Sequence, residues 1–185
     1  MQMSVKKIDI SKYCNHKLIY ENLPEGESYF GLDNICILKQ DFLSKYKTLK
    51  QGDLYNYCLG NQDNIACDGQ RIFIGSKVKR WHFIGFAYWG DVNEIIKVIF
   101  DDDTEDWIDI AFIEWSRLFV HGPWSGNLTH DNKIENVRVA VTAGDMIHLV
   151  YFHDCVCEFS KEKTVKEIIL PNNILVHIFA LTIEY

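Results

Sequence analysis

The chain has 185 residues, of which 48% are hydrophobic and 14% aromatic, and its 26 acidic and 19 basic residues give a formal net charge of −7. This size and composition predict a single domain, 1–185, with one substantial core. The only short basic block is Lys77-Val78-Lys79-Arg80, so nucleic acid and anionic membrane surfaces are not expected partners. No stretch approaches the roughly 20 apolar residues that a membrane-spanning helix needs.

Short segments rich in Ile, Val, Phe and Tyr recur along the chain and are separated by Gly, Asn and Asp. This rhythm is typical of an all-β fold, and we predict a two-sheet antiparallel β-sandwich with at most one or two short helical turns. The helical turns are expected at 41–50 and at Glu114–Leu118. The expected strands are 6–11, 17–21, 34–39, 55–59, 70–75, 80–88, 93–100, 106–113, 134–141, 146–152, 155–159, 165–169 and 174–184.

Residues 98–110, VIFDDDTEDWIDI, place six acidic side chains around Trp107. We interpret Asp102-Asp103 as the two-residue turn of a β-hairpin, which sets Val98 opposite Trp107. A metal site is the alternative, but same-face strand neighbours stand roughly 7 Å apart, whereas metal ligands converge within a few ångströms. The exposure of the Trp107 face stays open at this stage. In the register that sets Val98 opposite Trp107, one apolar face of the hairpin is formed by Ile95, Ile99, Ile108 and Ile110.

The six cysteines match no small disulfide framework, and free thiols in a reducing cytoplasm are the expected state. Cys58 and Cys67, nine residues apart around a turn, are the first pair to test for a disulfide. The N-terminal residues MQMSVKKIDISKY contain no apolar leader segment, which also favours a cytoplasmic location.

No motif predicts catalysis or a metal site. His153-Asp154-Cys155-Val156-Cys157 resembles half of a zinc site, but ligands on one strand face are too widely spaced for a single tetrahedral ion, so we interpret it as a core strand. The chain has no HxH or HExxH pair and no GxSxG elbow. We therefore predict no catalytic residues, no metal ligands and no cofactor. A structural calcium ion stays open as an alternative, although no motif indicates one.

Five segments follow one another along the chain: IDISKY at 8–13, SYFGLDNI at 28–35, QDNIACDGQRIFI at 62–74, HFIGFAYWGDVNEIIKVIFDDDTEDWIDI at 82–110 and LPNNILVHIFALTIE at 170–184. Together they resemble the jelly-roll, galactose-binding-like β-sandwich modules that accompany bacterial and fungal glycoside hydrolases. The resemblance implies sugar binding without catalysis, an opening strand that pairs near the closing one, and a hairpin over 93–110. The family commonly turns this hairpin with Asp-Gly, where this chain has Asp-Asp.

Five Trp and nine Tyr make aromatic platforms the main functional candidate. A pyranose ring stacks its C–H face on an aromatic ring while nearby polar groups bind its hydroxyls. A carbohydrate or glycan is therefore the expected partner; the oligomeric state is not predicted. The candidate carbohydrate-binding residues lie in GFAYWGD (85–91) and in or next to the long loop 119–133: Tyr88, Trp89, Asp91, Trp115, His121 and Trp124.

Two other functions stay open. The same exposed aromatics suit a protein interface, which would make the chain an interaction or assembly module. A small glycan hydrolase or lyase is the third hypothesis, because paired carboxylates are recognised by their separation in space and not from one sequence.

Overall fold

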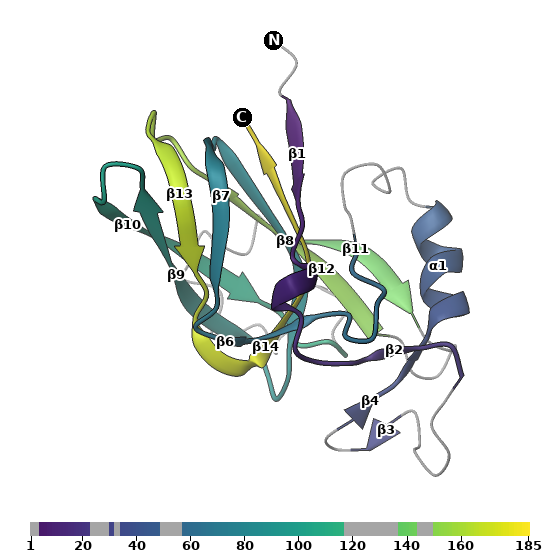
Figure 1. Ribbon diagram of the computed structural model, residues 1–185. Coiled ribbons are helices and arrows are strands. Elements are labelled where there is room, and N and C mark those ends of the chain that lie inside the picture. Colours follow the sequence, from purple (N-terminus) through teal and green to yellow (C-terminus); the bar gives the residue numbers. More distant parts are fainter. Residues whose placement is uncertain (1–3, 23–29, 32–33, 49–56, 117–136, 144–149) are drawn as a thin grey trace.

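In the computed structural model the chain forms two antiparallel β-sheets packed face to face (Figure 1). The predicted all-β, two-sheet sandwich is confirmed. The structure describes residues 4–22, 30–31, 34–48, 57–116, 137–143 and 150–185.

The larger sheet has the strand order β1-β14-β8-β12-β11, and β6 also pairs with β14. The smaller sheet has the order β10-β9-β13-β7. The first and last strands are neighbours, with Val5 opposite Glu184, as the resemblance implies. The larger sheet is built from β1 (Val5–Ile8), β6 (Ile65–Asp68), β8 (Arg80–Ala87), β11 (Val137–Ala143), β12 (Val150–Glu158) and β14 (Asn172–Glu184), and the smaller from β7 (Arg71–Lys77), β9 (Val92–Phe100), β10 (Glu105–Phe112) and β13 (Thr164–Ile169).

The helical part of the described chain is small. Helix α1 spans Lys39–Thr48, close to the predicted 41–50, and Figure 1 shows it beside β11 and away from the four-stranded sheet. The helical turn predicted at Glu114–Leu118 is wrong for Glu114–Ser116, because this stretch bridges to the sheet: Trp115 N donates to Ala87 O (3.1 Å). The remaining short elements are η1 (Ser11–Tyr13), β2 (Ile19–Tyr20), β3 (Phe30–Gly31), β4 (Asn34–Ile35) and β5 (Ile37–Leu38).

The six-stranded sheet is buried on both faces. One face packs on the four-stranded sheet through residues such as Trp81, Phe83 and Ile178. The opposite face forms a second cluster, in which Phe86, Phe152 and Phe179 of the sheet meet Leu18, Ile37 and Phe42 of the N-terminal segments and α1. Burial on both sides explains why β14 reads as a nearly continuous apolar run.

The acidic stretch forms the predicted hairpin between β9 and β10, but its loop has three residues, 101–103, instead of two. Phe100 N donates to Thr104 O (2.9 Å), and Asp103 has the left-handed conformation with φ 58°. Hairpin loops of three residues commonly end on a left-handed residue, and Asp tolerates that conformation.

This longer loop shifts the strand register by one residue, so the predicted register is wrong. Trp107 lies opposite Lys97 instead of Val98. Ile95, which the predicted register placed on the apolar face, is exposed. The buried residues of the two strands are Ile96, Val98, Phe100, Ile108, Ile110, Ala111 and Phe112.

Lysines before and within β13 balance the charge of the hairpin. Lys163 pairs with Asp102 and Lys166 with Asp103, each at 2.7 Å. The hydrogen bond from Lys163, followed by those from Thr104, lowers the pKa of Asp102 to about 2. The acidic turn of residues 101–103 is therefore stabilised by ion pairs with the lysines of the neighbouring segment.

All six cysteines are free. Cys58 does not form a disulfide with Cys67. The thiol of Cys58 lies next to Cys14, and burial, followed by this contact with Cys58, raises the pKa of Cys14. Cys155 lies in the main core and its Sγ donates to Ala111 O (2.9 Å), so the strand 150–158 uses this residue for packing.

A histidine ties three strands of the larger sheet together. His82 on β8 places Nδ1 3.2 Å from both carboxylate oxygens of Asp154 on β12, and Nε2 3.1 Å from Oε1 of Glu184 on β14. Arg80 continues the chain of contacts, with its guanidinium 3.0 Å from Glu184 and 2.7 Å from Glu158. His82 and Asp154 are buried, whereas Glu158 is exposed.

Candidate functional site

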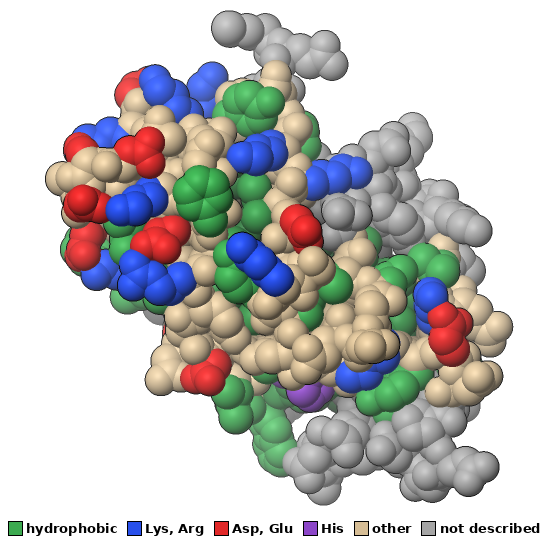
Figure 2. Space-filling view, viewed as in Figure 1, with side chains coloured by type: hydrophobic (Ala, Val, Ile, Leu, Met, Phe, Trp, Pro, Cys, Tyr) green, Lys and Arg blue, Asp and Glu red, His purple; other side chains and the backbone are tan. Residues whose placement is uncertain are grey.

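A hollow of about 350 Å³ lies at the edge of the sandwich, where the end of β8 meets β6 and β14. Its size falls in the range of small-ligand pockets, roughly 300–1,000 Å³. Figure 2 shows hydrophobic side chains projecting from this lower edge of the molecule. The hollow is lined by His16, Ala66, Tyr88, Trp89, Ile174, Leu175 and His177.

Trp89 is the most unusual residue of the hollow. Its φ is 62° and that of Gly90 is 116°, so the chain turns through two consecutive positive-φ residues. A bulky L-residue in the left-handed region costs roughly 1–2 kcal/mol. The indole recovers little of this cost by packing, because 66% of Trp89 is exposed. Strain that packing does not offset is typical of binding sites.

The turn that carries Trp89 is fixed on both sides. Before it, Tyr88 N donates to Leu175 O on β14 (2.9 Å). After it, the carboxylate of Asp91 accepts a hydrogen bond from Glu114 N (2.8 Å). Because Tyr88 and Asp91, which flank Trp89-Gly90, are anchored to different segments, Trp89 is held at the mouth of the hollow.

Three rings form the back wall. The rings of Tyr88 and His177 meet edge to face at 4.8 Å, and those of His177 and His16 at 4.9 Å. Asn64 Nδ2 donates to Asp63 Oδ1 (2.9 Å), which leaves Asn64 Oδ1 to accept from His177 Nδ1 at 2.7 Å. This contact orients the His177 ring and places its proton on Nδ1.

The two imidazoles are neutral near pH 7. Burial, and then the proximity of His16, lowers the pKa of His177 to about 3. Burial also lowers the pKa of His16, against the opposing charge of Asp63. A neutral imidazole has one donor and one acceptor nitrogen, so the hollow combines an exposed indole with uncharged polar groups.

Asp63 anchors the segment that carries His16. Its carboxylate is fully buried and accepts from Leu18 N (3.0 Å) and Ile19 N (2.8 Å), while Lys17 lies 3.1 Å away. Asp63 N in turn donates to His16 O (2.9 Å). One buried carboxylate thus joins β2 to the start of β6 and fixes the inner wall of the hollow.

We predict that Asp63→Ala lowers the free energy of unfolding by about 2 kcal/mol, because buried N–H groups lose a charged acceptor. Urea denaturation measures this effect. Asp68→Ala is the matched control, since Asp68 is an exposed acidic residue in the neighbouring β6, and we expect a change within about 0.5 kcal/mol. Equal effects of the two substitutions would contradict the anchoring role.

Only two of the predicted site residues line the hollow in the described part of the chain. Tyr88 and Trp89 line the hollow together. Asp91 does not line it; its carboxylate accepts a hydrogen bond from Glu114 N instead. Trp115 is partly buried and packs against the second hydrophobic cluster, which contains Phe86 and Phe152. His121 and Trp124 lie outside the described residues.

Sequence reasoning missed five residues of the hollow: His16, Ala66, Ile174, Leu175 and His177. Ile174, 64% exposed beside Trp89, follows Pro171-Asn172-Asn173, and an apolar residue directly after a turn sequence is the one available signal. His16 and His177 lie at opposite ends of the chain. Nothing in their local sequence indicates that they meet.

The Trp107 face is exposed, which answers the question that the sequence left open. Trp107 is 58% exposed, and Ile95 and Phe73 are also exposed on the outer face of the four-stranded sheet. Charged pairs such as Lys97–Glu105 (2.7 Å) lie between them, and Figure 2 shows acidic and basic side chains interspersed over this surface. The outer face is therefore a rival to the hollow as a binding surface.

Within the described residues, no group of three or more His, Cys, Asp or Glu side chains is placed to hold a metal ion. The described part of the chain also contains no helix long and apolar enough to span a bilayer.

Comparison with known protein families gives no match, and comparison with curated proteins gives no significant relative. The assignment of a function therefore depends on the hollow and its residues.

Proposed function

We propose that this protein binds carbohydrate without catalysing a reaction. A sugar ring stacks on Trp89, and its hydroxyl groups form hydrogen bonds with the wall that contains His16 and His177. The observation that carries the proposal is the strained and exposed conformation of Trp89, which packing does not explain. An aromatic face beside uncharged donors and acceptors suits the two sides of a pyranose, which are apolar C–H groups and hydroxyls.

The resemblance to jelly-roll, galactose-binding-like modules supports the same proposal. The pairing of β1 with β14 and the hairpin of β9 and β10 agree with what that resemblance implies. We therefore propose that the sandwich is a jelly roll of the galactose-binding-like type, with its ligand at the edge where β8 ends.

We predict that Trp89→Asn weakens binding to the preferred glycan by about five- to thirtyfold, because one stacking contact is worth about 1–2 kcal/mol. Asn tolerates the left-handed conformation, so the melting temperature should stay unchanged or rise. A glycan array with the unmodified protein identifies the ligand. Isothermal titration calorimetry then measures the dissociation constant, and differential scanning calorimetry the stability.

Trp107→Asn is the matched control, since it removes a comparably exposed indole from the outer face of the four-stranded sheet. This variant should bind as the unmodified protein does. Loss of binding in Trp107→Asn but not in Trp89→Asn would move the ligand to the outer face. Absence of binding to any glycan on the array would refute the proposed function itself.

A further inference from the structure

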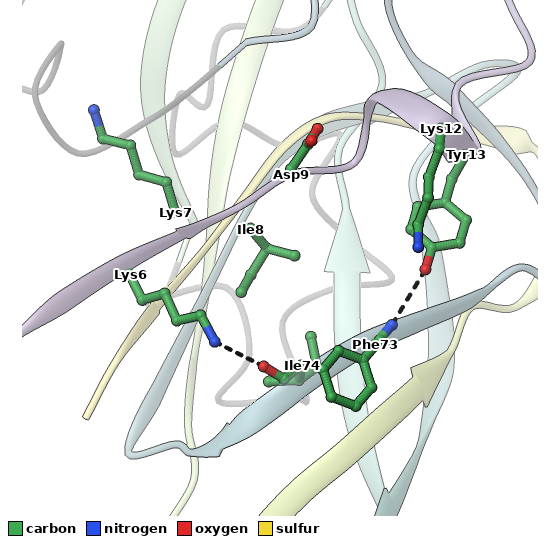
Figure 3. Close-up of a pocket in the computed structure, with 8 residues that line it drawn as sticks. All are labelled: Lys6, Lys7, Ile8, Asp9, Lys12, Tyr13, Phe73 and Ile74. Atoms are coloured by element: carbon green, nitrogen blue, oxygen red, sulfur yellow. Dashed lines mark hydrogen bonds between the residues drawn. The ribbon is translucent and has the colours of Figure 1, made fainter.

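A second hollow, of about 410 Å³, opens on another side of the sandwich, between β1 with η1 and the edge strand β7 (Figure 3). Ile8 and Ile74, both buried, form its apolar floor. Tyr13 and Phe73 add aromatic rings, and Lys6 and Lys12 add ammonium groups.

Two side-chain hydrogen bonds cross this hollow, one from β1 to β7 and one between η1 and β7. Lys6 Nζ donates to Ile74 O (2.8 Å), and Phe73 N donates to the hydroxyl of Tyr13 (3.3 Å). Figure 3 shows both bridges, one on each side of the opening. The bridges take the place of direct backbone pairing between β1 and β7 and leave a space between them.

Phe73 presents a ring face at the rim. It is 64% exposed, and its ring lies against Gly75 so closely that a Cβ at that position would be 2.7 Å from the ring. Gly75 also has a φ of +59°, which glycine adopts without strain. The glycine thus makes room for an aromatic ring that lies on the backbone and stays open to solvent.

The hollow also brings together two lysines that form no ion pair with a carboxylate of the described residues. Elsewhere, described basic side chains such as Lys17, Lys97 and Arg71 pair with carboxylates. Lys6 and Lys12 have no carboxylate partner among the described residues, although the protein carries a net charge of −7.

The lining contains two more charged side chains, Lys7 and Asp9. Figure 3 shows Lys7 and Asp9 pointing to the opposite side of the β1 backbone from Lys6. The Asp9 carboxylate accepts from Ser11 N (2.9 Å), and its pKa is lowered first by hydrogen bonding to Ser11 and then, more weakly, by the charge of Lys12. The charge that faces the hollow is therefore positive, from Lys6 and Lys12, the latter lying 4.8 Å from the centre of the Tyr13 ring.

We propose that this hollow binds a hexuronate residue of an acidic glycan. The carboxylate of the sugar lies between the ammonium groups of Lys6 and Lys12, and the C–H face of its ring stacks on Phe73. The choice of a sugar, as opposed to another ring-bearing acid, rests on the proposed function. The site is separate from the Trp89 hollow and selects for charge, whereas the Trp89 hollow offers neutral polar groups.

Isothermal titration calorimetry with a trimer of galacturonate and a neutral trimer of galactose tests the proposal. We expect the acidic trimer to bind, and Lys12→Gln and Phe73→Leu each to weaken that binding at least about fivefold. Lys79→Gln is the control, since Lys79 is also exposed and without a carboxylate partner among the described residues but lies outside the hollow. It should leave the affinity unchanged.

Trp89→Asn separates the two proposals. Acidic-trimer binding that survives Trp89→Asn and is lost in Lys12→Gln supports the second site, even where neutral glycans fail to bind. Acidic-trimer binding that is lost in Trp89→Asn and kept in Lys12→Gln overturns the second site and leaves the first intact. Absence of acidic-trimer binding, or equal affinity for a glutamate trimer, also overturns it.

Discussion

Replacing Gly85 by Ala is expected to destabilise this protein by at least about 3 kcal/mol, a loss that overpacked core positions reach. Gly85 lies in β8, at the centre of the larger sheet. A Cβ there would stand 2.2 Å from the carbonyl oxygen of His177 and 3.3 Å from the ring of Phe112. The first contact is with the backbone of the neighbouring strand β14, which cannot turn aside as a flexible side chain can.

Urea denaturation of Gly85→Ala measures the loss, and the yield of soluble protein shows whether the variant folds at all. Gly60→Ala is the control, because the nearest atom to its Cβ would be Gln62 O at 3.6 Å, an ordinary contact. We expect Gly60→Ala to change the free energy of unfolding by less than about 0.5 kcal/mol. A Gly85→Ala protein as stable as the unmodified one would show that β8 and β14 are not packed as closely as described.

The second large effect is expected at Asp154, the buried carboxylate that faces His82. Asp154→Ala should lower the free energy of unfolding by about 3 kcal/mol, because Nδ1 of the buried His82 loses its acceptor on β12. In a domain of this size each kcal/mol lowers the melting temperature by about 2–4 °C. Differential scanning calorimetry should therefore show a loss of about 10 °C.

Glu158→Ala gives the matched comparison. Glu158 belongs to the same chain of charges and lies on the same strand, but its side chain is exposed and pairs with Arg80. We expect a loss below about 1 kcal/mol, as is usual for surface ion pairs. If both substitutions cost the same, burial of the network does not determine its contribution.

Strand positions were predictable where burial follows the local pattern. The apolar run of β14 and the hairpin of β9 and β10 are examples. The hairpin register was wrong because it depends on the left-handed conformation of Asp103, and three consecutive aspartates do not indicate which one adopts it. β12 was predicted as two strands because Asp154 interrupts its apolar pattern. The partner that allows Asp154 to be buried, His82, lies 72 residues away.

The candidate site was predictable only in part, for a similar reason. Tyr88-Trp89-Gly90 stood out because large aromatic residues next to a glycine turn are visible locally. The rest of the hollow is formed by contacts between distant segments. His16 meets His177 through Asp63 and Asn64, whose buried hydrogen bonds have no local sequence signature.

The bridges from Lys6 and Tyr13 to β7 also bear on solubility at high concentration. β7 is the last strand of its sheet, and the free N–H and C=O groups of such a strand can recruit a strand from another molecule. The Phe73 N–H and the Ile74 C=O are occupied by side chains of the same chain. With these groups occupied, the N-terminal segment hinders the pairing of β7 with a strand of another molecule, which is the first step toward fibrous aggregates.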